Sequence, residues 1–318
     1  MRKNPPLCLL FCLTMCFPSF GFEEKNITVR GTLNNARISF ESGKPATVAF
    51  MGGSITEMKG YRLIMMEWLE NRFPQAKFNF INAGISSTCS TTGAFRLRRD
   101  VLNHGPIDLF FLEFAVNDDQ DADHNRKACI RGMEGIIRQV RMKNPKTEII
   151  VTYFVNKGML AMLQSGIEPV SMSAHEKVLE KYGVSRIHLA RELAHQISNN
   201  QFTWDKFGGT HPKEPGNQLC ADMHIEMFNK SWDERLPDQF EKYPLPENPI
   251  DSLSYFNGRF LSPRNVQGKG WTFSEPDWEK LDGIKRSRYL GIPMLHSDSP
   301  NLPIRLNFSG RAIGAFVV

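Results

Sequence analysis

The segment IDLFFLEF at residues 107–114 sets the fold class expected for this chain. Its apolar residues run almost without interruption instead of alternating with polar ones, which is typical of a strand buried on both faces of a parallel sheet. Such strands occur in proteins where helices cover both sides of the sheet. The central part of the chain is therefore expected to be a parallel sheet between two layers of helices.

The flanking segments continue this alternation of strand and helix, which predicts a three-layer α/β/α domain over residues 30–235. In the segment 92–102, Arg96, Arg98 and Arg99 are expected outside the apolar face of a helix. The further strands are predicted at 47–51, 78–82 and 148–154, and the helices at 61–72, 92–102, 128–143, 171–181, 188–197 and 215–232.

The first residues predict a secretory signal peptide over residues 1–21. Arg2 and Lys3 precede an apolar run, and the small residues Ser19 and Gly21 stand near its end. The run is short and contains proline, which disfavours a membrane-spanning helix. The protein is therefore expected to be secreted or periplasmic, with no membrane attachment after removal of the signal.

The amino-acid composition of the chain changes after residue 235. Residues 236–250 contain four prolines and predict a semi-rigid linker. Residues 251–318 form short segments rich in turn residues and aromatics, which predict a small β-rich domain. The sequence stops within a predicted strand, so this domain is expected to be incomplete.

Charge and cysteine content limit the classes of partner. The formal net charge of the 318 residues is +5, two basic residues leave with the signal, and no basic stripe is visible, which argues against nucleic acid. After the signal, the cysteines are Cys89, Cys129 and Cys220, an odd number without metal-ligand spacing. No metal and no cofactor is expected, and the oligomeric state is left open.

Two glycine-containing segments follow the first two predicted strands, at the sheet edge where α/β proteins bind ligands. Ser54 stands in MGGSIT, where paired glycines permit a sharp bend, but a free serine hydroxyl needs a base to act as a nucleophile. Gly84 stands in NAGIS and can present its backbone N–H to a ligand. Taken alone, the Ser54 segment is equally well explained as an ordinary turn, and for Gly84 a plain loop glycine is the favoured explanation.

Two polar residues follow later elements. Asn117 stands in AVND after the strand at 107–114, where it can donate its amide or form an Asx turn. His211 stands in a glycine-rich loop, and the proline after it is suited to opening the last predicted helix. A loop histidine alone is more often structural than catalytic, so the order of the four segments carries the functional prediction.

The order of Ser54, Gly84, Asn117 and His211 resembles the SGNH (GDSL-like) hydrolase superfamily, whose four blocks are named for these residue types. The resemblance covers roughly residues 46–232 and implies a flavodoxin-like α/β fold. It also implies that Ser54 is the nucleophile and His211 its base. The oxyanion donors would be the backbone N–H groups of Ser54 and Gly84 and the side chain of Asn117.

The chain departs from the family pattern at two positions. Ala115 replaces the leading glycine of the Gly-x-Asn-Asp block, and Gly208 stands where the family places an aspartate three residues before the histidine. The nearest acid is Asp205, which is assigned as the third catalytic residue. A backbone carbonyl is the alternative, since this group mainly orients the imidazole.

The resemblance implies two-step acyl transfer on an ester. A secreted SGNH domain followed by a β domain is similar to bacterial carbohydrate esterases, so the expected substrate is a short-chain, acetyl ester of a small molecule or polysaccharide. Absence of G-x-S-x-G argues against an α/β-hydrolase. The alternatives are an inactive carbohydrate-binding module and an acyl-lipid esterase, for which the apolar segment 158–162 is the one lid candidate.

Overall fold

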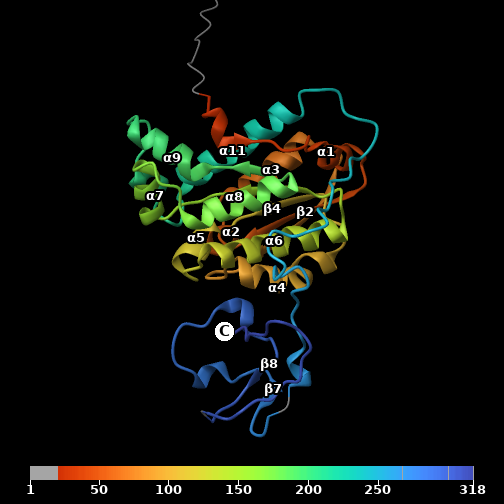
Figure 1. The fold of residues 1–318 in the computed structure, drawn as a ribbon, viewed down its shortest axis with the longest axis vertical. Helices are drawn as coiled ribbons and strands as arrows, with labels where there is room; N and C mark the ends of the chain where they lie inside the picture. Colours follow the sequence, from red (N-terminus) through yellow and green to blue (C-terminus); the bar gives the residue numbers. More distant parts are fainter. Residues whose placement is uncertain (1–20, 267, 300, 318) are drawn as a thin grey trace, which may run out of the picture.

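The computed structural model of the chain describes residues 21–266, 268–299 and 301–317 (Figure 1). The predicted signal peptide therefore lies outside the described residues, except for Gly21. Among the described residues, no helix has both the length and the apolar character that a membrane crossing requires.

A mostly parallel sheet lies between two layers of helices, as the sequence predicts (Figure 1). The strand order is β1-β6-β5-β4-β2-β3, and β2 to β6 run parallel while the short β1 pairs antiparallel with β6. The parallel part has the flavodoxin-like order. The strands of this sheet are β1 (Ile27–Thr28), β2 (Pro45–Gly52), β3 (Lys77–Gly84), β4 (Leu109–Leu112), β5 (Glu148–Thr152) and β6 (Ser185–Ile187).

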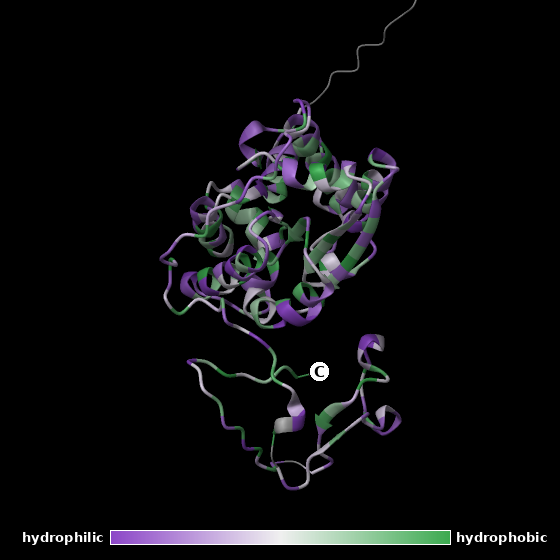
Figure 2. Cartoon of the chain, turned by 90° about the vertical axis from the view of Figure 1, so that its right-hand side faces the viewer, coloured by the Kyte–Doolittle hydropathy of each residue, from purple (hydrophilic) through white to green (hydrophobic). Residues whose placement is uncertain are grey.

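The helices form two groups that pack within themselves, α4 with α6 and α8 on one side, and α3 with α11 on the other. Figure 2 shows apolar strands enclosed by helices whose outer turns are hydrophilic. The helices are α1 (Asn34–Glu41), α2 (Ser54–Glu57), α3 (Tyr61–Arg72), α4 (Ser90–Asp100), α5 (Ala115–Gln120), α6 (Arg126–Lys143), α7 (Lys157–Gln164), α8 (Val170–Tyr182), α9 (Leu189–Ser198), α10 (Trp204–Phe207) and α11 (Glu214–Ser231).

Strand β4 lies inside the sheet between β5 and β2, and its four residues are all buried. Phe111 of β4 stacks on Phe50 of β2, with 4.7 Å between the ring centroids. The strand is shorter than the predicted 107–114, since Phe114 leaves the extended conformation (φ −152°, ψ 2°) to start α5. The residues that follow β4 are thereby aimed along the carboxyl edge of the sheet.

The predicted linker at 236–250 packs on the sheet rather than standing free. Tyr243 is buried, its hydroxyl donates to Glu148 Oε2 (2.6 Å), and its N–H donates to the carbonyl of Pro145 (2.9 Å). These bonds place the linker beside the amino end of β5, at the edge opposite the carboxyl ends of the strands.

The carboxyl-terminal segment contains a small antiparallel sheet of β7 (Thr272–Ser274) and β8 (Met294–His296). Two arginines of this segment contact loops at the carboxyl edge of the main sheet. Arg286 donates to the carbonyl of Ser86 (3.0 Å), and Arg288 pairs with Glu57 at the end of α2 (3.1 Å). Single-turn 3₁₀ helices occur at Glu24–Asn26, Leu102–His104, Pro263–Asn265, Trp278–Lys280 and Ser287–Tyr289.

Candidate active site

Ser54 and His211 form a hydrogen-bonded pair at the carboxyl edge of the sheet. Ser54 is the first residue of α2 and follows β2 after a single intervening glycine. Its Oγ lies 2.7 Å from Nε2 of His211, although 157 residues separate the two in sequence. The distance suits proton transfer from the hydroxyl to the imidazole, which is the contact a serine nucleophile requires.

A buried glutamate, Glu113, holds the backbone in front of Ser54. Its Oε1 accepts hydrogen bonds from the N–H of Gly53 and the hydroxyl of Thr56, both at 2.8 Å. A Cβ on Gly52 would collide with this carboxylate, so the close approach requires glycine. Burial raises the pKa of Glu113 to about 7. Burying this carboxyl therefore costs stability, and its hydrogen bonds fix the loop before the serine.

Sequence reasoning missed Glu113, although a signal was present. It is the one carboxylate near the end of the apolar segment IDLFFLEF, where a charged side chain is costly unless donors surround it. An acid in such a position at a strand end indicates that its carboxylate accepts hydrogen bonds from neighbouring groups. Here the donors are those of the Ser54 loop.

Arg96 joins the ends of two strands from beneath the site. Its guanidinium donates to the carbonyl of Ala83 in β3 (2.6 Å) and to that of Gly52 in β2 (2.9 Å). The prediction that Arg96 lies outside the apolar face of its helix was wrong, because the side chain is fully buried. Strand-end carbonyls give the guanidinium acceptors inside the protein. Arg98 and Arg99 are exposed, as predicted.

The predicted oxyanion donors Gly84 and Asn117 both lie against the loop and helix that carry Ser54. A Cβ on Gly84 would collide with the backbone of α2, and a Cβ on Gly53 would collide with the Asn117 side chain. Each donor already has an acceptor. The Gly84 N–H donates to Asn82 Oδ1 (3.0 Å), and the Asn117 amide donates to Asp121 Oδ2 (2.6 Å).

The loop that carries His211 is anchored through Asn217 of α11. The Asn217 amide donates to the carbonyls of Pro212 (2.7 Å) and Lys213 (3.0 Å), while its Oδ1 accepts from the N–H of Tyr61 (2.8 Å). Asn217 thereby connects the histidine loop to the start of α3. His211 itself is exposed.

Gly208 has a conformation that explains why the family aspartate is missing from this position. Its φ is +105°, in the left-handed region, and a Cβ there would collide with the backbone nitrogen of Lys213. That nitrogen donates to the carbonyl of Phe207 (2.9 Å) and closes the turn. An aspartate at residue 208 is therefore incompatible with this loop.

Asp205 is not brought to His211 in this conformation. It lies exposed on α10, and among the described residues it makes no hydrogen bond or ion pair with the imidazole. Within that same part of the chain, the one side-chain hydrogen bond of His211 is the bond to Ser54. The role of Asp205 as the third catalytic residue stays a prediction.

The sheet order and the paired serine and histidine define the SGNH class of ester hydrolases. The sequence matches the model of the GDSL-like lipase/acylhydrolase family over residues 50–219. The chain belongs to that family and is a carboxylic ester hydrolase. No curated protein matches the sequence.

Several solved structures share the fold. A two-domain esterase active on acetylated mannans, co-crystallised with mannopentaose, has a TM-score of 0.65 and 24% identity, covering 80% of this chain and 67% of that chain. A second structure of a two-domain esterase active on acetylated mannans has a TM-score of 0.66 and 24% identity, covering 80% and 68%. A structure from Parabacteroides merdae described as a GDSL-like lipase has a TM-score of 0.50 and 20% identity, covering 58% and 96%.

Proposed function

We propose that the protein is a serine esterase that removes short acyl groups, principally acetyl, from carbohydrates. The observation that carries this proposal is the 2.7 Å contact between Ser54 Oγ and His211 Nε2 in a family of acyl hydrolases. The carbohydrate part rests on the likeness to an esterase active on acetylated mannans, which extends over 80% of this chain. The substrate is an acylated small molecule or polysaccharide, and no cofactor is assigned.

In the proposed mechanism, His211 accepts the proton of the Ser54 hydroxyl through Nε2 as the oxygen attacks the ester carbonyl. The tetrahedral oxyanion is bound by the N–H groups of Ser54 and Gly84 and by the Asn117 amide. Collapse of the intermediate breaks the bond to the alcohol, which leaves with the proton from the imidazole. Water activated by His211 then hydrolyses the acyl-enzyme and restores the serine.

The Gly84 N–H must exchange its partner when substrate binds, whereas the Asn117 amide has a second N–H to donate. Gly84 and Asn117 at present donate to Asn82 and Asp121, which are side chains of the same loops. An oxyanion carries more charge than a neutral amide acceptor, and hydrogen bonds to charged groups are stronger. We therefore propose that Asn82 accepts the Gly84 N–H only in the absence of substrate. When substrate binds, this N–H donates to the developing oxyanion instead.

The two alternative functions are less well supported. The binding module requires no proton acceptor beside Ser54, yet the imidazole lies at hydrogen-bonding distance from it. The lipid esterase was expected to use the apolar segment 158–162 as a lid. In α7 this segment buries Met159 and Leu160 against the domain, which leaves them unable to serve as a lid in this conformation.

Location and domain division belong to the same proposal. We assign residues 1–21 to a signal peptide, which makes the esterase secreted or periplasmic, and residues 251–318 to a β-rich domain after a linker at 236–250. No nucleic acid and no membrane partner is proposed.

The test compares hydrolysis of p-nitrophenyl acetate, butyrate and octanoate by wild type, Ser54→Ala and His211→Ala. We expect preference for acetate and a loss of about 10⁴-fold or more in kcat for either variant. Ser165→Ala, an exposed serine at the end of α7, is the matched control and should keep full activity. Acetate release from acetylated mannan and xylan then tests the carbohydrate part.

Undiminished activity in Ser54→Ala would remove the nucleophile assignment. A preference for octanoate would favour the acyl-lipid esterase. Acetate-preferring activity on the small esters without any release from acetylated polysaccharides would restrict the substrate to acylated small molecules.

A further inference from the structure

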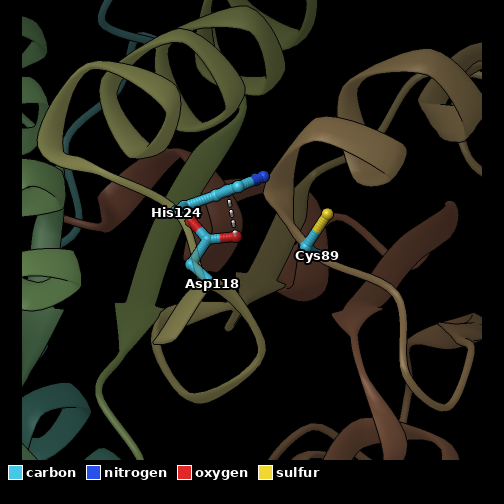
Figure 3. A group of neighbouring side chains, drawn as sticks. All are labelled: Cys89, Asp118 and His124. Atoms are coloured by element: carbon cyan, nitrogen blue, oxygen red, sulfur yellow. Dashed lines mark ion pairs between the residues drawn. The ribbon is translucent and has the colours of Figure 1, made fainter. Parts of the chain in front are cut away.

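A group of metal-binding side chains lies beside α5, one residue beyond Asn117. One ligand atom from each of Cys89, Asp118 and His124 lies within 4.8 Å of the other two. Figure 3 shows these three side chains approaching one another, with Cys89 coming from the start of α4 and the other two from α5 and the loop after it. We call these three residues the Cys89 cluster.

The carboxylate of Asp118 is held in a fixed orientation. The backbone N–H of Ser90 donates to Oδ1 (2.8 Å) and the Ser90 hydroxyl donates to Oδ2 (2.7 Å). His175 of α8 places Nε2 2.8 Å from the same Oδ2, and both side chains are fully buried. These contacts leave Oδ1 directed toward His124 before any ion binds, which is the function of the outer partners in metal sites.

The nitrogen that faces this carboxylate forms an ion pair with it but no hydrogen bond. Nδ1 of His124 is buried and makes no hydrogen bond within the described part of the chain, although it lies 3.3 Å from Oδ1 of Asp118. Buried polar atoms are rarely left without a partner. Two ligand atoms at 2.0–2.1 Å from a tetrahedral zinc ion are roughly 3.3–3.4 Å apart. The observed separation leaves room for an ion bound to both atoms, in place of the direct ion pair.

The types of ligand atom in the Cys89 cluster indicate which metal ion it would prefer. The Cys89 cluster offers one sulfur, one imidazole nitrogen and one carboxylate oxygen, a set that suits zinc, whereas magnesium and calcium prefer oxygen alone. Cys89 is partly exposed, which gives an ion access from solvent. We propose that Cys89, Asp118 and His124 bind one Zn²⁺ ion, with water in the fourth position.

The two remaining neighbours form an outer layer. Cys129 and His175 lie with Asp118 in a second group whose ligand atoms are also within 4.8 Å of one another, and all three residues are buried. In this assignment His175 orients the carboxylate and Cys129 packs behind it. Neither Ser54 nor His211 belongs to either group, so the ion would bind apart from the proposed nucleophile and base.

The position of the site predicts what zinc would stabilise. Asp118 is adjacent to Asn117 in α5, and Cys89 immediately precedes α4. An ion bound to both would connect the two helices at the carboxyl edge of the sheet. Because such an ion binds the folded chain and not the unfolded one, zinc should raise the melting temperature in a concentration-dependent manner.

The first experiment uses the full chain, reduced and freed of metal by a chelator, and titrates it with Co²⁺ as a spectroscopic probe for Zn²⁺. Coordination by Cys89 should produce a thiolate-to-cobalt charge-transfer band in the near ultraviolet, which Zn²⁺ should then displace. A titration without this band would overturn the proposal, and that result does not depend on any variant folding.

The second experiment measures zinc affinity and content in Cys89→Ala and His124→Ala, with Cys220→Ala as the matched control. Cys220 is buried on α11 beside another histidine, His224, far from the cluster in sequence. We expect the two cluster variants to lose about 100-fold or more in affinity, beyond the 10–100-fold typical of outer partners. Cys220→Ala should bind as wild type does.

Equal zinc binding by Cys89→Ala and wild type would overturn the proposal. Loss of zinc in Cys129→Ala with retention in Cys89→Ala would do the same, because it would move the ion to the second group. Ser54→Ala should bind zinc normally and lose esterase activity, so failure of the metal site and failure of the proposed function are separable.

Discussion

The two members of the proposed catalytic pair are supported in different ways. The loop before Ser54 is fixed by buried groups, with Glu113 accepting from Gly53 and Arg96 donating to the carbonyl of Gly52. His211 is exposed, and its loop is held by hydrogen bonds from the Asn217 side chain to backbone carbonyls instead of by a carboxylate on the imidazole. The proposed nucleophile is thus preorganised by the protein interior, while the proposed base depends on the shape of its loop. We call Ser54 with its supporting groups the buried half of the site, and His211 with its loop the exposed half.

Replacing Asn117 should produce the largest effect among changes in the buried half. We expect Asn117→Ala to lower kcat by about 10²–10³-fold with little change in KM, because an oxyanion donor acts in the transition state. Steady-state hydrolysis of p-nitrophenyl acetate measures both constants. The exposed Asn199→Ala serves as control. An unchanged kcat in a correctly folded Asn117→Ala would show that the buried half positions the serine without binding the oxyanion.

Glu113 should make the buried half sensitive to pH. Its pKa is raised to about 7, so the folded protein holds a proton there that the unfolded chain releases near pH 4.5. The free energy of unfolding should therefore fall as pH rises from about 4.5 to 7, by about 3 kcal/mol. Glu113→Gln removes this contribution and should gain stability relative to wild type over that range.

Urea unfolding of both proteins at several pH values between 5 and 8 checks this expectation. The exposed Glu70→Gln is the matched control and should follow the wild-type curve. Stability curves of Glu113→Gln and wild type that run parallel across this range would contradict the buried-acid account.

Asp205→Asn should produce the smallest effect and tests the exposed half. Because Asp205 is exposed and makes no bond to His211 among the described residues, we expect kcat to fall by less than about 10-fold. A loss of about 10⁴-fold, the size seen for the acid of a complete triad, would instead show that Asp205 reaches the imidazole when substrate is bound. The kcat of both proteins for p-nitrophenyl acetate distinguishes the outcomes.

The sequence predicted the fold well where elements are long and patterned. The helix at 61–72 coincides with α3, and the apolar segment at 107–114 contains β4. The two-residue β1 and three-residue β6 were missed, since strands this short show no periodicity. They depend on hydrogen bonds to neighbours that only the folded chain supplies.

The candidate site was predicted less completely. Ser54, Gly84, Asn117 and His211 follow from their order along the chain, and the structure brings all four to one edge of the sheet. The supporting groups were not predicted, because their roles depend on contacts between distant segments. The Cys89 cluster is of this kind, since 29 and 35 residues separate Cys89 from its two partners and no ligand motif spans them.

Gly208 also sets a rule for engineering this enzyme. A designer who wishes to complete the triad would be drawn to Gly208→Asp, which restores the residue found in the family. With φ at +105° and the Lys213 nitrogen filling the space of a Cβ, that substitution would break the turn that presents the histidine. The productive route is to graft a longer or differently shaped loop between α10 and α11, and to introduce the acid afterwards.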